Sequence, residues 1–151
     1  MENRSNPLKR TFSQSTLQNN NPWGRVIIIG ENQTQFNLLS PLFIIGRNHH
    51  CNLVIKDKSI SSKHCIISIE KMKREDGIEI HKTFIQDFST HGTFVDSIKI
   101  LKSEKYLLYH GAIISLNLPS NGKVKPGRSF QPTMEKLLFK NALEREFYNL
   151  R

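Results

Sequence analysis

The stretch LFIIGRNHHCNLVIKDKSISSKHCIISI, residues 42–69, decides the fold class. It holds short apolar runs at 42–45, 53–55 and 65–69, and mostly polar residues or glycine lie between them. Short β-branched runs broken by Gly, Asn, Asp and Ser are typical of strands joined by tight loops. Alternating strands and helices would need longer periodic segments. The stretch therefore predicts an all-β fold.

The same pattern of short apolar runs separated by polar residues continues on both sides, from Trp23 to about residue 119. Further short runs lie at 26–29, 78–80, 84–85, 93–95, 106–108 and 113–116. Asp76-Gly77 is a pair that favours a hairpin turn. This many short strands predict a β-sandwich or barrel. A two-sheet sandwich gathers its connecting loops at its two ends.

Three segments flank the predicted sandwich of residues 23–119. Residues 1–22 are polar and contain an asparagine run, so we expect a disordered arm. Residues 120–131 are rich in Gly, Lys and Pro and are expected to be a linker. Residues 132–151 are expected to form an amphipathic helix, because apolar residues recur there every three or four positions. We expect it to pack back on the sandwich; the alternative is that it leads into a segment beyond residue 151. These residues are Leu138, Phe139, Ala142, Leu143, Phe147 and Leu150.

Composition and charge narrow the class of protein. Hydrophobic residues make up 37% and charged residues 23%, which suits a buried core. The net charge is +9, of which +2 lies in residues 1–22, +3 in 23–119 and +4 in 120–151. Positive charge favours acidic or phosphorylated partners. No apolar run approaches the roughly 20 residues of a membrane span, and no secretory signal is present, so we expect an intracellular protein without a membrane segment.

Metal binding and catalysis are not expected. Cys51 and Cys65 are the only cysteines, too few for a disulfide framework. His49-His50-Cys51 and His64-Cys65 could suggest zinc, but the paired short spacings of structural zinc sites are absent. The sequence has no phosphate-binding Gly-rich loop with lysine and no paired nucleophile and base. We therefore expect no cofactor, no metal and no enzyme activity in this chain.

Three predicted loops carry residues that suit an oxyanion. They contain Gly46-Arg47, the segment 59–64 and the segment 87–95. Arginine presents a planar fork of donors that matches phosphate oxygens. Serine and threonine hydroxyls and loop N–H groups can complete the oxygen shell without adding charge. Glycine relaxes the backbone where the chain turns sharply. Together the segments predict an anion site at one end of the sandwich.

The order and spacing of these segments resemble the signature of the forkhead-associated (FHA) family. The matching pattern is Gly46-Arg47, then Ser61-x-x-His64, then Asp87-x-Ser89-x-x-Gly92-Thr93. Leu108-Tyr109-His110-Gly111 is similar to the closing turn of the family, with Ala112 in the usual place of aspartate. The resemblance spans residues 23–119. It implies a β-sandwich that binds phosphothreonine peptides.

The resemblance also implies roles for individual residues. Arg47 and Ser61 would bind the phosphate, and Thr90 would lie beside it. Ser62 stands where the family often has a basic residue or asparagine, so a second cation would be missing and only a hydroxyl or N–H is offered. His91 replaces an asparagine that contacts the peptide main chain, and its ring titrates near neutrality.

Four further residues are expected to shape the binding loops. Gly46, Gly92 and Thr93 would set the loop backbones, and His64 would tie the binding loop to its neighbours. The choice of residue three places after the phosphothreonine would fall to Lys58–Ile60 and to the segment Asp96–Lys99.

The expected function is recruitment of a phosphothreonine-containing partner, in nuclear signalling or the DNA-damage response, with a nuclear or nucleocytoplasmic location. Lys9-Arg10 gives this location only slight support. One alternative is the N-terminal regulatory arm of a larger protein kinase, a setting that Ser13-Gln14 and Thr34-Gln35 would suit. The other is a basic nucleic-acid binder, which the absence of an aromatic-and-basic RNA-binding motif disfavours. The pattern predicts no particular oligomeric state.

Overall fold

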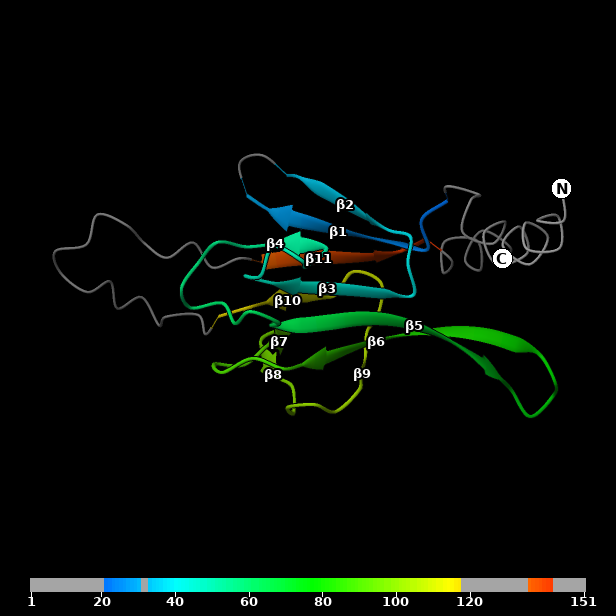
Figure 1. Cartoon of the computed structure of the whole chain (residues 1–151). Helices are drawn as coiled ribbons and strands as arrows, with labels where there is room; N and C mark the ends of the chain where they lie inside the picture. The colour runs from blue at the N-terminus through cyan, green and yellow to red at the C-terminus, as the bar shows by residue number, and fades with distance from the viewer. Residues whose placement is uncertain (1–20, 31–32, 118–135, 143–151) are drawn as a thin grey trace, which may run out of the picture.

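Two β-sheets stack face to face in the computed structural model, which describes residues 21–30, 33–117 and 136–142 (Figure 1). The six-stranded sheet has the order β2-β1-β11-β10-β7-β8, and the five-stranded sheet has the order β4-β3-β5-β6-β9. The prediction of an all-β, two-sheet sandwich is confirmed.

The strands are short except in one hairpin. The six-stranded sheet contains β1 (Gly24–Ile29), β2 (Gln35–Leu38), β7 (Phe94–Val95), β8 (Ile98–Lys99), β10 (Ile113–Ser115) and β11 (Lys136–Asn141). The five-stranded sheet contains β3 (Leu42–Gly46), β4 (Leu53–Val54), β5 (Cys65–Lys73), β6 (Glu79–Asp87) and β9 (Tyr106–Leu107).

The core lies between the sheets because side chains alternate between the two faces of a strand. In β6, Thr83, Ile85 and Asp87 are buried while their neighbours are more exposed. Ile85 lies directly opposite Ile67 of β5, and both side chains are fully buried. The six-stranded sheet contributes Val26, Ile114 and Phe139, which are also fully buried.

Strands β5 and β6 form one long antiparallel hairpin, from Cys65↔Asp87 to Lys73↔Glu79. Its turn contains the predicted Asp76-Gly77 pair, and Gly77 adopts a φ of +83°, which glycine accepts without steric cost. Figure 1 shows the hairpin reaching beyond the sandwich, away from the ends of β3 and β6. Residues 79–80 and 84–85 therefore belong to one strand. Of the polar residues between them, His81 is exposed, Lys82 is half-buried and Thr83 is buried.

The helix predicted over 132–151 is wrong for residues 136–141, which form β11. This strand lies between β1 and β10, with Val26 opposite Phe139 and Ile114 opposite Leu137. Leu137, Phe139 and Asn141 are buried while the residues between them are less so. Such a short apolar run fits a strand as well as a helix, and pairing on both sides selects the strand.

Strand β11 also extends the sandwich beyond residue 119, where the sequence pattern had placed its end. The disordered arm predicted for 1–22, apart from Asn21 and Pro22, and the linker predicted for 120–131 lie outside the described residues, as do 132–135 and 143–151 of the predicted helix.

Candidate functional site

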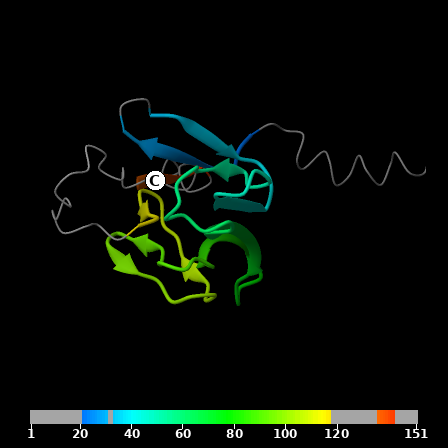
Figure 2. The ribbon, with the colours of Figure 1, turned by 60° about the vertical axis from the view of Figure 1, so that its left-hand side comes forward.

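The loops that follow β3, β4 and β6 meet at one end of the sandwich, which Figure 2 turns toward the viewer. We call it the loop end. A hollow of about 230 Å³ lies there. It is lined by Arg47, Lys58, Ser59, Ile60, Ser61, Ser62, Thr90 and His91. The structure thus brings together all the residues predicted to contact a phosphopeptide: Arg47, Ser61, Ser62, Thr90 and His91.

Gly46 allows β3 to approach the loop between β4 and β5. The N–H of Arg47 donates to the carbonyl of Ser61 at 3.0 Å, and the N–H of Asn48 donates to that of Ser62 at 3.1 Å. A Cβ added at Gly46 would lie 2.2 Å from the carbonyl oxygen of Ser62, far inside van der Waals contact. Glycine is therefore needed here for its small size. The close approach places Arg47 beside Ser61.

Ser61 joins the two loops that face Arg47. Its hydroxyl oxygen accepts the N–H of Thr90 at 2.9 Å and lies 3.5 Å from the hydroxyl oxygen of Thr90. A hydroxyl that accepts a hydrogen bond still has its own proton to donate. Because that second contact is long, the Ser61 proton can turn to an anion in the hollow.

His64 is a fully buried bridge between the same loops. The N–H of Ser61 lies 3.2 Å from its Nδ1, and the carbonyl of Gly92 lies 3.1 Å from its Nε2. A backbone N–H can only donate, so Nδ1 accepts and Nε2 carries the proton that Gly92 receives. Burial lowers the pKa of His64, although the Gly92 carbonyl opposes this shift. The neutral ring thus holds the two loops in register.

Asp87 organises the loop that carries Thr90 and His91. Its Oδ1 accepts the N–H of Ser89 at 2.9 Å, the hydroxyl of Ser89 at 2.5 Å and the hydroxyl of Thr93 at 2.8 Å. The Ser89 hydroxyl in turn accepts the N–H of Gly92 at 2.7 Å. Asp87, Ser89 and Thr93 are all buried. These bonds fix the backbone from which Thr90 and His91 project into solvent.

Asp87 and Ser89 belong to the matching sequence pattern, but no role was predicted for either of them. A usable signal was present, since an Asp-x-Ser at a strand end often folds back on its own backbone. Gly92 has a φ of +105° in this turn. A Cβ there would also lie 2.7 Å from Cε of Lys99.

Lys58 supplies a second cation, which the serine at position 62 had led us not to expect. The turn before the hollow is held by Asp57, whose Oδ1 accepts the N–H of Ser59 at 2.8 Å and its hydroxyl at 2.6 Å. The Ser59 hydrogen bonds lower the pKa of Asp57, and the Ile60 side chain is buried. The predicted specificity segment 58–60 lines the hollow, whereas none of the residues 96–99 does.

The two cysteines lie apart from any metal-binding arrangement. The thiol of Cys51 donates to the carbonyl of Ser62 at 3.3 Å. Cys65 is buried in the core, and burial raises the pKa of its thiol. Among the described residues, no three His, Cys, Asp or Glu side chains gather closely enough to hold a metal ion. Nor does this part of the chain contain a helix long and apolar enough to cross a membrane.

Known proteins share the sequence pattern of this site. Residues 43–117 match the family model of the FHA domain. The chain is 37% identical over 114 residues to the Dictyostelium discoideum protein named "Probable serine/threonine-protein kinase fhkE", a match that covers 76% of the chain and 15% of the relative. It is 31% identical over 98 residues to the E3 ubiquitin-protein ligase CHFR of Mus musculus, covering 63% of the chain and 14% of the ligase.

Solved structures share the fold. The MEK1 FHA domain superposes with a TM-score of 0.61 at 20% identity, covering 88% of the chain and 98% of that domain. The N-terminal FHA domain of S. cerevisiae Rad53p, solved with a phosphothreonine peptide, superposes with a TM-score of 0.59 at 21% identity and covers 83% of the chain and 98% of its own.

Proposed function

Because the chain belongs to the FHA family, we propose that it is a phosphothreonine-dependent interaction module that recruits a phosphorylated partner to its loop end. One observation carries the proposal. The hydrogen bond from Arg47 N–H to the Ser61 carbonyl, with the close packing of Gly46 on Ser62, sets a guanidinium and a hydroxyl at the same hollow.

The chemistry of the hollow suits a phosphate group. Arg47 can donate a fork of hydrogen bonds, each contributing roughly 1.5–3 kcal/mol when the donor is charged. Ser61 adds a hydroxyl donor, and Lys58 adds a point charge at the rim. No carboxylate lines the hollow among the described residues, so nothing there repels a dianion.

The peptide around the phosphate would meet the remaining residues. Thr90 lies beside Ser61 and would contact the phosphothreonine, while Ser62 offers its hydroxyl or N–H. His91 is exposed next to it and would hydrogen-bond the peptide main chain in place of an amide. The segment 58–60 would contact the residues that follow the phosphothreonine.

The wider setting is also part of the proposal. The chain spans 14–18% of the length of the first three curated relatives that it matches, two protein kinases and a ubiquitin ligase. We propose a non-catalytic role for this chain in nuclear signalling or the DNA-damage response. A regulatory arm of a larger protein kinase is the second candidate, favoured by the relatives whose names describe kinases.

The experiment is fluorescence polarisation with a degenerate phosphothreonine peptide library, alongside phosphoserine and unphosphorylated libraries. We expect micromolar binding that needs the phosphate and prefers threonine. Arg47→Ala should abolish it, since the main charged donor is lost. Arg74→Ala is the matched control, because it removes the same charge from the exposed hairpin.

Phosphate-independent binding, or equal loss in Arg47→Ala and Arg74→Ala, would contradict the proposal. Circular dichroism of both variants shows whether the fold is intact. Binding to DNA or RNA with a steep salt dependence, together with no binding to phosphopeptides, would instead favour a nucleic-acid-binding function.

A further inference from the structure

A second small cavity lies near the end of the sandwich opposite the loop end. Its volume is about 100 Å³. It is lined by Arg25, His110, Lys140, Asn141 and Ala142. These residues come from the start of β1, the end of β11 and the turn before β10. Figure 1 shows these strand ends on the side away from the ends of β3 and β6.

Two positive charges face each other at this cavity. Arg25 lies directly opposite Lys140 in the antiparallel register of β1 and β11. Directly opposite residues share a face of the sheet, with Cβ atoms about 4.5–5.5 Å apart, and like charges there are destabilising. Both side chains are exposed, and no acidic side chain in the described part of the chain pairs with either. The residue on the other side of Arg25, in β2, is the neutral Asn37.

His110 adds a third donor. Its Nδ1 lies 3.0 Å from the backbone nitrogen of Asn141, whose N–H it accepts in one tautomer, and 3.2 Å from the carbonyl oxygen of Asn141, to which it donates in the other tautomer or when charged. Accepting that bond leaves the proton of the neutral ring on Nε2, and the imidazolium carries a proton there as well. In the Nε2-protonated tautomer and in the imidazolium, the histidine therefore offers an N–H besides the guanidinium and the ammonium.

We propose that this cavity is a second oxyanion site, which takes a single phosphate group. An anion between Arg25 and Lys140 would turn their mutual repulsion into two charge-assisted hydrogen bonds. The cavity is small beside the roughly 300–1,000 Å³ of ordinary ligand sites, so a single group fits better than a nucleotide. Since it lies away from the loop end, it acts independently of the proposed phosphothreonine hollow and does not rest on that function.

The test uses the full chain with Arg47→Ala as background, which removes the main ligand of the loop hollow. Thermal unfolding is followed with inorganic phosphate, and separately with acetate and with chloride at matched ionic strength. We expect phosphate to raise the melting temperature by about 2–4 °C, acetate by less and chloride least. NMR should show the largest phosphate-induced ring shift at His110.

Adding Arg25→Gln or Lys140→Gln should have two opposite effects. The melting temperature without phosphate should rise, because repulsion is relieved, and the increment from phosphate should be lost. Lys73→Gln, an exposed lysine of the β5–β6 hairpin, is the matched control and should keep the increment.

The proposal is overturned if chloride raises the melting temperature as much as phosphate does, since that would mean general charge screening. It is also overturned if the Arg25→Gln variant keeps the full phosphate-induced rise in melting temperature. A larger effect of acetate than of phosphate would overturn the phosphate assignment and indicate a carboxylate ligand. The melting temperature is measured in a protein that lacks Arg47. The absence of a phosphate effect there would leave the phosphothreonine proposal untouched, and a failure of the phosphopeptide titration would leave the second oxyanion site untouched.

Discussion

The loop end and the β5–β6 hairpin tip, residues 70–82, differ in the burial of their polar side chains. At the loop end His64, Asp87, Ser89 and Thr93 are buried. His64 lies within hydrogen-bonding distance of Gly92 in the neighbouring loop, and Asp87 accepts hydrogen bonds from Ser89 and Thr93 in its own loop. At the hairpin tip the polar groups remain in solvent. The ion pair Lys71–Glu79 spans 2.7 Å with both side chains 58% exposed, and Arg74–Asp76 spans 2.9 Å.

This difference in burial determines which of the two regions has a fixed side-chain arrangement. A buried donor without a partner costs about 1–3 kcal/mol, so each buried polar group at the loop end holds its neighbours in one arrangement. An exposed ion pair contributes about 0–1 kcal/mol and restrains little. The loop end is therefore built to present Arg47, Ser61, Thr90 and His91 in a defined arrangement, whereas the hairpin tip tolerates change.

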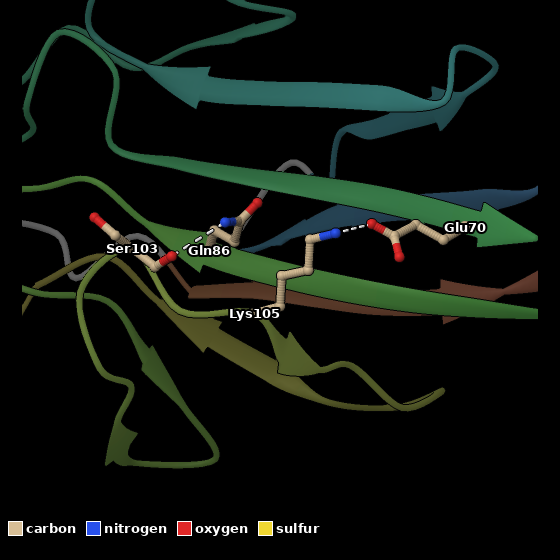
Figure 3. A network of polar contacts seen from close by, with 4 residues as sticks. All are labelled: Glu70, Gln86, Ser103 and Lys105. Carbon is tan, nitrogen blue, oxygen red and sulfur yellow. Dashed lines mark hydrogen bonds and ion pairs between the residues drawn. The ribbon is translucent and has the colours of Figure 1, made fainter. Parts of the chain in front are cut away.

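Further contacts join the base of the hairpin tip, at Glu70, and β6 to the segment 103–105. Figure 3 shows Lys105 paired with Glu70 and Gln86 donating to the carbonyl of Ser103 at 3.2 Å. They attach the segment 103–105 to the outer face of β5 and β6. The Lys105 and Glu70 side chains are 47% and 36% exposed, so this network is expected to behave more like the hairpin tip than like the loop end.

The largest expected effect comes from Asp87→Ala. It leaves the N–H of Ser89 and two hydroxyls without their acceptor, so we expect a loss of about 3 kcal/mol in the free energy of unfolding. Asp87→Asn keeps an oxygen acceptor and should lose less. Urea unfolding followed by tryptophan fluorescence measures both. Equal stability of Asp87→Ala and the wild type would remove the contrast between the two regions.

Gly46→Ala should follow in size. The new methyl group would meet the Ser62 carbonyl, and relieving that overlap requires backbone movement, for which we expect about 2 kcal/mol. Gly30→Ala is the matched control, because a Cβ at Gly30 meets nothing within 4 Å. The same urea titration compares them. Comparable losses in the two variants would contradict the close packing of β3 on the second loop.

Acid should weaken the loop end through His64. Burial holds its pKa below the ordinary value of 6.5 in the folded chain, so below about pH 6.5 the unfolded chain binds more protons. This contribution is present above pH 6.5 and is lost as the pH falls, by at most about 1.4 kcal/mol per pH unit. Unfolding measured between pH 7.5 and 5.5 tests the trend.

His81, at the hairpin tip, provides a control for the pH dependence of stability. His64→Gln should flatten the pH dependence, whereas His81→Gln, which changes an exposed ring, should leave it in place. An unchanged pH profile in His64→Gln would exclude the buried histidine as its source.

The smallest effect is expected at the hairpin tip itself. Replacing both partners of the Lys71–Glu79 pair by glutamine should change the free energy of unfolding by less than about 1 kcal/mol, because the pair is exposed. It should leave phosphopeptide affinity unchanged. A tenfold loss of affinity in this double variant would show that the hairpin tip takes part in binding.

The sequence predicted the candidate site better than it predicted the fold's edges. Arg47, Ser61 and Thr90 come from three loops, and the spacing of their segments was enough to place them at one hollow. Lys58 was missed as a second cation because the pattern pointed only to position 62. Asp87 and Ser89 were given no role, although an Asp-x-Ser at a strand end often folds back on its own backbone; only the structure shows that both are buried.

Strand β11 shows why local pattern failed at the C-terminal end. Apolar residues at 137–139, followed by others at three- and four-residue spacing, fit a helix, and nothing local distinguishes the alternatives. What selects the strand is pairing with β1 and β10, which are far away in sequence.

Backbone amide NMR with a phosphothreonine peptide tests the central claim most directly. We predict that the amide resonances of Ser61, Ser62, Thr90 and His91 shift on addition of the peptide, while those of residues 70–82 stay in place. The same peptide without phosphate should cause no shifts. Shifts centred on the hairpin tip, or none at the loop end with a folded protein, would contradict the account.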